Sequence, residues 1–184
     1  MPAAAASPAP WRGQGVRVMI LGLSLAAFTV IHVLISLVAI GAGIVVLGGM
    51  FRAHRLDRWT ALFLIFTLLT SLTGFLFPIK GFTPALGTGL VSTAILLVAL
   101  GALYGGHLLG PWRPIYVVCA VTALYLNVLV LIVQSFQKVP PLHVLAPTGS
   151  EAPFLVAQAI ALVVAAAAGI LAVRRFHPER FAAA

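Results

Sequence analysis

The sequence predicts an all-α polytopic membrane protein, a bundle of about five transmembrane helices with a Pro-rich outer loop. Hydrophobic residues make up 62% of the 184 residues and charged residues only 8%, whereas soluble domains carry roughly 25% charged residues. The apolar residues also fall in long unbroken blocks, which are typical of membrane spans. We therefore expect one transmembrane domain over residues 16–176, between an N-terminal tail at 1–15 and a C-terminal tail at 177–184.

Short segments rich in Gly, Pro or basic residues separate the apolar blocks, because proline cannot continue a helix and glycine weakens one. The first apolar block continues well past Ser24-Leu25-Ala26, a weak signal-cleavage site, so this helix is expected to stay uncleaved. The predicted spans are 16–51, 59–77, 85–104, 114–136 and 153–173.

The basic residues lie in the connections rather than along one helix face. This placement argues against nucleic-acid binding, which needs a contiguous basic surface, despite a net charge of +8. Positive flanks stay in the cytoplasm, so we expect the N-terminus outside and the C-terminus in the cytoplasm. The cytoplasmic side would hold Arg52, Arg55, Arg58, Arg113, Arg174, Arg175 and Arg180, and the outer side Arg12, Arg17, Lys80 and Lys138.

Uncharged polar side chains recur at helical spacing inside the spans, and under this orientation they fall in the outer half of the bilayer. Small and polar residues on one stripe of a helix typically face neighbouring helices. The cluster is therefore either a set of hydrogen bonds between helices or a small binding site below the outer loop. The candidate ligand-binding residues are His32, Ser36, Asn127, Gln134, Lys138, His143 and Gln158.

The sequence gives no support for catalysis. The four later spans contain no Asp, Glu, Lys or Arg, which leaves no paired carboxylates and no charged ion path. We therefore predict no catalytic residues and lean against an enzyme. We predict no cofactor, with one alternative: a b-type haem ligated by His32, with His143 as its second ligand. Cys119, the only cysteine, is expected to be a small buried hydrophobe.

The connection at 138–152 is too apolar for a free linker. Leu142, Val144 and Leu145 suggest a stiff cap that folds back on the bundle. Ser150 is expected to cap the fifth span, and Glu151 suits the positive end of its helix dipole.

The chain resembles a group of small, uncharacterised bacterial inner-membrane proteins. The similar stretches are 56–63, 73–78, 125–128, 134–140, 145–148 and 150–151, and the likeness covers most of the chain after His32. The resemblance implies a bacterial multi-pass membrane protein. It supplies no activity and no functional residues.

These observations lead to a functional expectation. The chain is expected to be a non-enzymatic accessory subunit, or a binder of a small apolar or weakly polar ligand at the outer polar cluster. Its partners would be the lipid bilayer and another membrane subunit, and not nucleic acid. A haem- or quinone-linked redox protein using His32 is the alternative, and a small transporter or channel is the third hypothesis.

Overall fold

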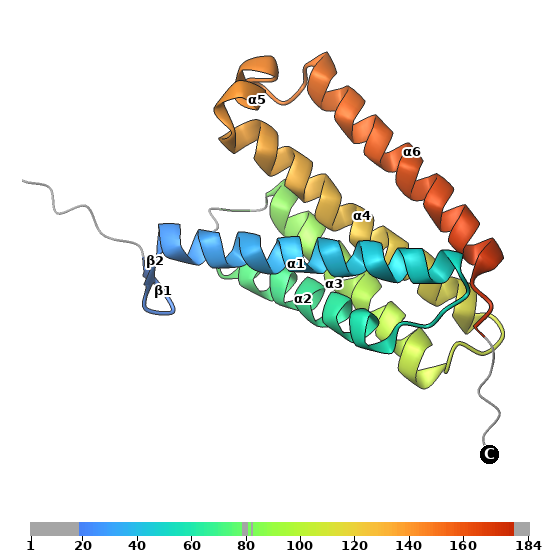
Figure 1. Cartoon of the computed structure of the whole chain (residues 1–184). Coiled ribbons are helices and arrows are strands. Elements are labelled where there is room, and N and C mark those ends of the chain that lie inside the picture. The colour runs from blue at the N-terminus through green and yellow to red at the C-terminus, as the bar shows by residue number, and fades with distance from the viewer. Residues whose placement is uncertain (1–18, 79–80, 82, 179–184) are drawn as a thin grey trace, which may run out of the picture.

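The chain folds into long helices that run back and forth across one bundle (Figure 1). A computed structural model describes residues 19–78, 81 and 83–178. In this part of the chain five helices are long and apolar enough to cross a membrane, which confirms the predicted all-α membrane bundle. They are α1 (Leu25–Phe51), α2 (Asp57–Phe75), α3 (Pro84–Leu100) with its continuation η1 (Gly101–Gly105), α4 (Trp112–Lys138) and α6 (Ala152–Arg175).

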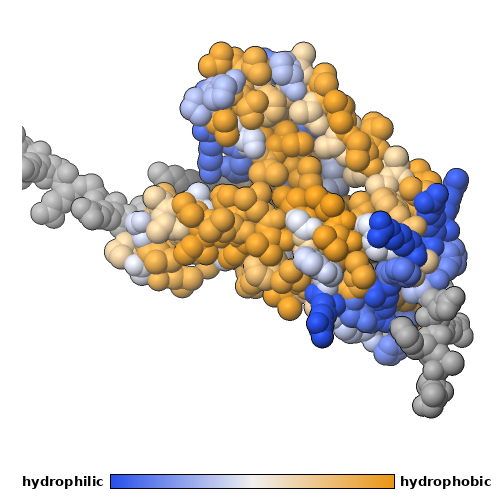
Figure 2. All heavy atoms as spheres, in the orientation of Figure 1, coloured by the Kyte–Doolittle hydropathy of each residue, from blue (hydrophilic) through white to orange (hydrophobic). Residues whose placement is uncertain are grey.

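The two ends of the bundle differ in charge. We call one the basic end; it carries Arg52, Arg55, Arg58, Arg113, Arg174 and Arg175, at the ends of α1 and α6 and the starts of α2 and α4. We call the other the loop end; there the chain passes from α4 through α5 (Pro140–Leu145) to α6. Figure 2 shows an apolar band over the helices, with hydrophilic residues gathered at the basic end. Arg12, Arg17, Lys80 and Arg180 lie outside the described residues, as does the predicted tail at 1–15.

The first helix begins later than predicted. Residues 16–18 lie outside the described residues, and two short strands, β1 (Met19–Ile20) and β2 (Leu23–Ser24), pair antiparallel before α1. Leu21 and Gly22 connect them with φ values of 52° and 79°, as in the tight turns that join hairpin strands. Ser24 then caps α1, because its side chain accepts a hydrogen bond from the Ala27 N–H. The predicted start at residue 16 was wrong because turn and cap signals outweighed the continuous apolar run.

The other spans match the predicted ones except at their ends. α2, α4 and α6 extend slightly beyond the apolar blocks, to include polar terminal residues such as Asp57, Lys138 and Arg175. α3 begins with a Thr83 cap and Pro84 in its first turn, which suits a residue without a backbone donor. It ends in η1, a single π-helical turn bounded by Gly101 and Gly105.

The outer loop contains a short helix that was not predicted. α5 contacts α4, but Val144 is 77% exposed and Leu145 53% exposed. The prediction that these two side chains pack on the bundle is therefore wrong. Ala146 is the buried residue of this segment instead, and Leu142 is half-buried.

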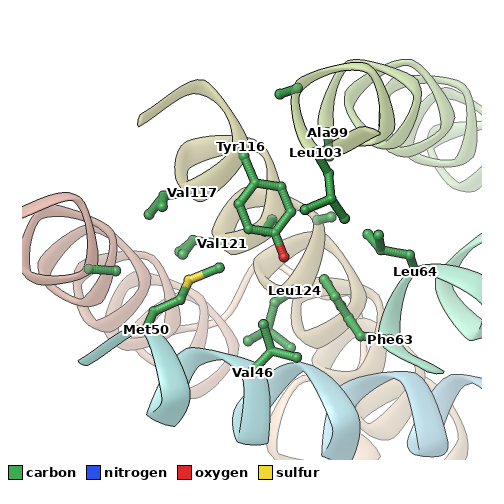
Figure 3. Packing of buried hydrophobic residues seen from close by; sticks show 14 of the residues in the cluster. Val46, Met50, Phe63, Leu64, Ala99, Leu103, Tyr116, Val117, Val121 and Leu124 are labelled. Carbon is green, nitrogen blue, oxygen red and sulfur yellow. The ribbon is translucent and has the colours of Figure 1, made fainter. Parts of the chain in front are cut away.

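The packed core lies near the basic end. Figure 3 shows Tyr116 of α4 at its centre, among side chains of α1, α2 and η1. From Ala39 onward α1 contributes seven buried residues, but from Leu25 to Val38 only Phe28 is buried. On α4 the buried positions run from Tyr116 to Asn127, with only Phe136 beyond them. The loop-end halves of these helices therefore contribute few buried side chains.

Helix α6 is the most peripheral of the five. It packs on α4 and, to a smaller extent, on α1, and Ala172 is its only buried residue. In Figure 1, α1 and α6 meet at the basic end and separate toward the loop end. The bundle is thus closed at one end and splayed at the other.

Candidate functional site

His32 lies between α1 and α2. Its Nδ1 atom is 2.7 Å from Thr73 Oγ1, and its ring meets Phe77 edge to face at 5.2 Å. Thr73 Oγ1 also lies 2.6 Å from the Leu69 carbonyl of its own helix, so this hydroxyl joins the α2 backbone to the His32 ring.

Asn127 joins α4 to α2. Its Nδ2 donates to Thr67 Oγ1 at 3.2 Å, and Thr67 is fully buried. A buried amide without this partner would carry a desolvation cost, so the pair fixes the contact between the two helices.

Gln158 joins α6 to α4, where its Nε2 donates to the Leu129 carbonyl at 3.4 Å. Its Oε1 is covered and has no hydrogen-bond partner among the described residues, and the same is true of Gln134 Oε1. These two amide oxygens are the polar atoms of the predicted cluster that the described part of the bundle leaves unsatisfied.

The remaining candidates lie apart from these contacts. Ser36 Oγ donates to the His32 carbonyl at 2.8 Å, within its own helix. Lys138 ends α4 and His143 lies on α5, both exposed. The bonds described above connect α1 with α2, α2 with α4, and α4 with α6 separately. They tie His32, Asn127 and Gln158 to neighbouring helices and do not join the seven candidates into one hydrogen-bonded cluster.

The turn before α6 is organised by Glu151 rather than by the predicted Ser150 cap. The Glu151 carboxylate accepts hydrogen bonds from the backbone N–H groups of Thr148 and Ser150 and from the Thr148 hydroxyl. These bonds, with the Thr148 backbone first, lower the pKa of Glu151 to about 2. α6 itself starts without a side-chain cap.

Sequence reasoning missed a large groove at the basic end. It encloses about 1050 Å³ and is lined by residues 52–56, 107–110, 113 and 177–178. Its signal in the sequence was the recurrence of Arg and His in two connections and in the segment after α6. Only the fold brings these segments together.

Metal and haem ligands are sparse. No group of three or more His, Cys, Asp or Glu side chains gathers anywhere in the described residues. His32 packs between helices and His143 is exposed on α5, and a haem held by this pair stays a prediction. Cys119 is half-buried on α4.

Comparison with known protein families, curated proteins and solved structures found no match for this chain. The resemblance to small bacterial membrane proteins therefore stays a prediction, and any functional conclusion has to come from the geometry.

Proposed function

We propose that this protein is a non-enzymatic accessory subunit of a membrane assembly. In this proposal a partner's transmembrane helix packs against the loop-end halves of α1 and α6. The protein would lie in a bacterial inner membrane with its basic end in the cytoplasm, as positive flanks require.

The observation that carries the proposal is the uneven packing of the bundle. Lipid chains are as apolar as leucine, so helices associate in membranes through close packing and hydrogen bonds. The basic-end halves of α1 and α4 contain most of their buried side chains, whereas their loop-end halves and nearly all of α6 leave most side chains uncovered. An added helix between the splayed ends would gain the packing that the chain alone lacks.

The two unsatisfied amide oxygens support the same proposal. Gln134 and Gln158 both lie in the loop-end halves of their helices. Transfer of an amide group from water to an apolar environment without a hydrogen bond costs about 2–7 kcal/mol, and the hydrocarbon of a membrane supplies no such bond. Both oxygens are covered in the isolated chain, so each side chain would have to rotate before it could meet a donor on a partner helix. The new hydrogen bond would then remove this cost.

Photocrosslinking in native membranes tests the proposal with matched positions. Val30 and Ile44 lie about four turns apart on one face of α1 and are 59% and 58% exposed. Val156 and Ile170 form an equivalent pair on α6, at 55% and 57%. With a photoreactive amino acid at each site, we expect a protein adduct of defined mass at Val30 and Val156. Equal protein adducts at Ile44 and Ile170, or lipid adducts alone at all four, would contradict the proposal.

A further inference from the structure

The groove at the basic end gathers positive charge from segments far apart in the sequence. Its walls come from the α1–α2 connection, the connection between η1 and α4, the first turn of α4 and the residues after α6. Half of its twelve lining residues are basic or titratable: Arg52, His54, Arg55, His107, Arg113 and His177. The volume of about 1050 Å³ is at the upper end of the range of ligand pockets.

No acidic side chain lines the groove among the described residues. Asp57 is the nearest described acid in the sequence, and it is paired with Arg55. Glu179 follows the lining residue Pro178 and lies outside the described residues. The remaining charges of the wall, on Arg52 and Arg113, have no carboxylate partner in the described part of the chain.

Arg113 is held in place at the groove wall. Its Nη1 donates to the carbonyls of Val173 at 3.0 Å and Phe176 at 2.5 Å, at the C-terminal end of α6. This contact suits the negative end of the helix dipole and fixes the guanidinium plane. The three N–H groups on Nε and Nη2 are not used by any hydrogen bond among the described residues, so Arg113 keeps donors for a further acceptor.

The loops of the groove are held in unusual backbone conformations. Ala53, His107 and Leu108 have φ values of 57°, 49° and 56°, a region that costs non-glycine residues roughly 1–2 kcal/mol each. Trp112 anchors the second loop by lying against Gly106, where even a Cβ atom would come within 2.2 Å of the indole. Surrounding packing thus maintains the shape of the groove.

Two exposed tryptophans at the basic end indicate the depth of the groove in a membrane. Trp59 and Trp112 are 45% and 43% exposed at this end of the bundle, and exposed tryptophans of membrane proteins concentrate at the interface. A phosphate group offers several acceptor oxygens and a full negative charge, which match a guanidinium with spare donors.

We propose that this groove binds the phosphate group of an anionic phospholipid. Arg113 and Arg52 would supply charge-assisted hydrogen bonds, and His54, His107 and His177 would supply further donors around the headgroup. Inorganic phosphate shares the chemistry of the headgroup, so the test includes it as a separate arm.

The competing explanation is general attraction, since any basic flank is drawn to an anionic membrane surface. Arg58, Arg174 and Arg175 lie at the same end but do not line the groove, and they provide matched controls. The full chain in detergent would be titrated with phosphatidylglycerol, phosphatidylcholine or inorganic phosphate, with retained lipid counted by native mass spectrometry.

We expect one tightly retained phosphatidylglycerol and no equivalent retention of phosphatidylcholine. The Arg52→Gln/His107→Gln double variant should bind it about tenfold more weakly, as expected for a lost charge-assisted hydrogen bond. Both side chains are exposed and bond to no described residue, so the fold should persist. Arg113→Gln should weaken binding similarly, with thermal unfolding checked because this change also removes the contact with α6.

The control variant Arg174→Gln/Arg175→Gln should keep its affinity within about twofold. Equal weakening in the control would overturn the proposal in favour of general surface attraction. Unchanged binding in the groove variants would also overturn it. If inorganic phosphate at millimolar concentration occupies the groove and displaces the lipid, the assignment to a lipid headgroup is overturned.

Discussion

Replacement of Gly43 by alanine tests the close packing of α1 against α2 and α4. A Cβ atom at this position would lie 2.8 Å from Leu124 Cδ1 and 2.9 Å from Phe63 Cε2, whereas ordinary contact begins at 3.4 Å. Phe63 is only 1% exposed, so its ring has little room to move. We expect the added methyl group to lower the free energy of unfolding by about 1–3 kcal/mol through overpacking.

Gly41 and Gly48 provide controls in the same helix, because a Cβ atom at either position meets nothing within 4 Å. The gain in helix propensity from Gly to Ala is common to all three variants. The difference in the free energy of unfolding between Gly43→Ala and the controls should therefore equal the overpacking cost. For a chain of this size, Gly43→Ala should then melt about 2–12 °C below the controls.

Thermal unfolding in mild detergent can be followed with a thiol-reactive dye, because Cys119 is the only cysteine of the chain and lies half-buried on α4. Its exposure on unfolding reports loss of the core. If Gly43→Ala melts at the same temperature as Gly41→Ala and Gly48→Ala, or above it, the described contact of the three helices is wrong.

Three further predictions concern the polar residues. A double-mutant cycle of Asn127→Ala and Thr67→Ala should give a coupling of about 0.6–1.7 kcal/mol in unfolding assays, as expected for hydrogen bonds between membrane helices; zero coupling would remove this bond. The folded-state pKa of Glu151, about 2, lies below its ordinary 4.5, so its stabilisation of the 148–151 turn is fully present above pH 4.5 and is lost as the pH falls through about 2. NMR titration of the Thr148 amide should follow this change in the native chain and show none in Glu151→Gln. Purified protein should show no Soret band, as expected for a chain without a haem cofactor; a band that disappears in His32→Ala would support the haem hypothesis instead.

The sequence predicted the fold class because long apolar blocks are a direct consequence of a lipid environment. It failed at the start of α1, where Gly22 turns the chain between two short strands and Ser24 caps the helix, inside an unbroken apolar run. It also missed α5, because a helix of six residues that starts with two prolines has no apolar period to read.

The candidate site was less predictable than the fold. Helical spacing correctly placed Asn127 toward a neighbouring helix, but it could not say that Thr67 would be the partner. Likewise, it could not say that Thr73 would be the partner of His32. The basic groove was missed for the same reason, because its walls depend on how two connections and the segment after α6 meet.

Side-specific cysteine labelling tests most directly the claim that five helices cross the membrane. In a Cys119→Ser background, Ser150→Cys reports the loop end and His177→Cys reports the basic end. With a membrane-impermeant maleimide, we expect Ser150→Cys to be labelled in intact cells and His177→Cys only after the cytoplasmic side is opened. Labelling of both from the same side would contradict the five-span bundle, and a reversed pattern would contradict its proposed orientation.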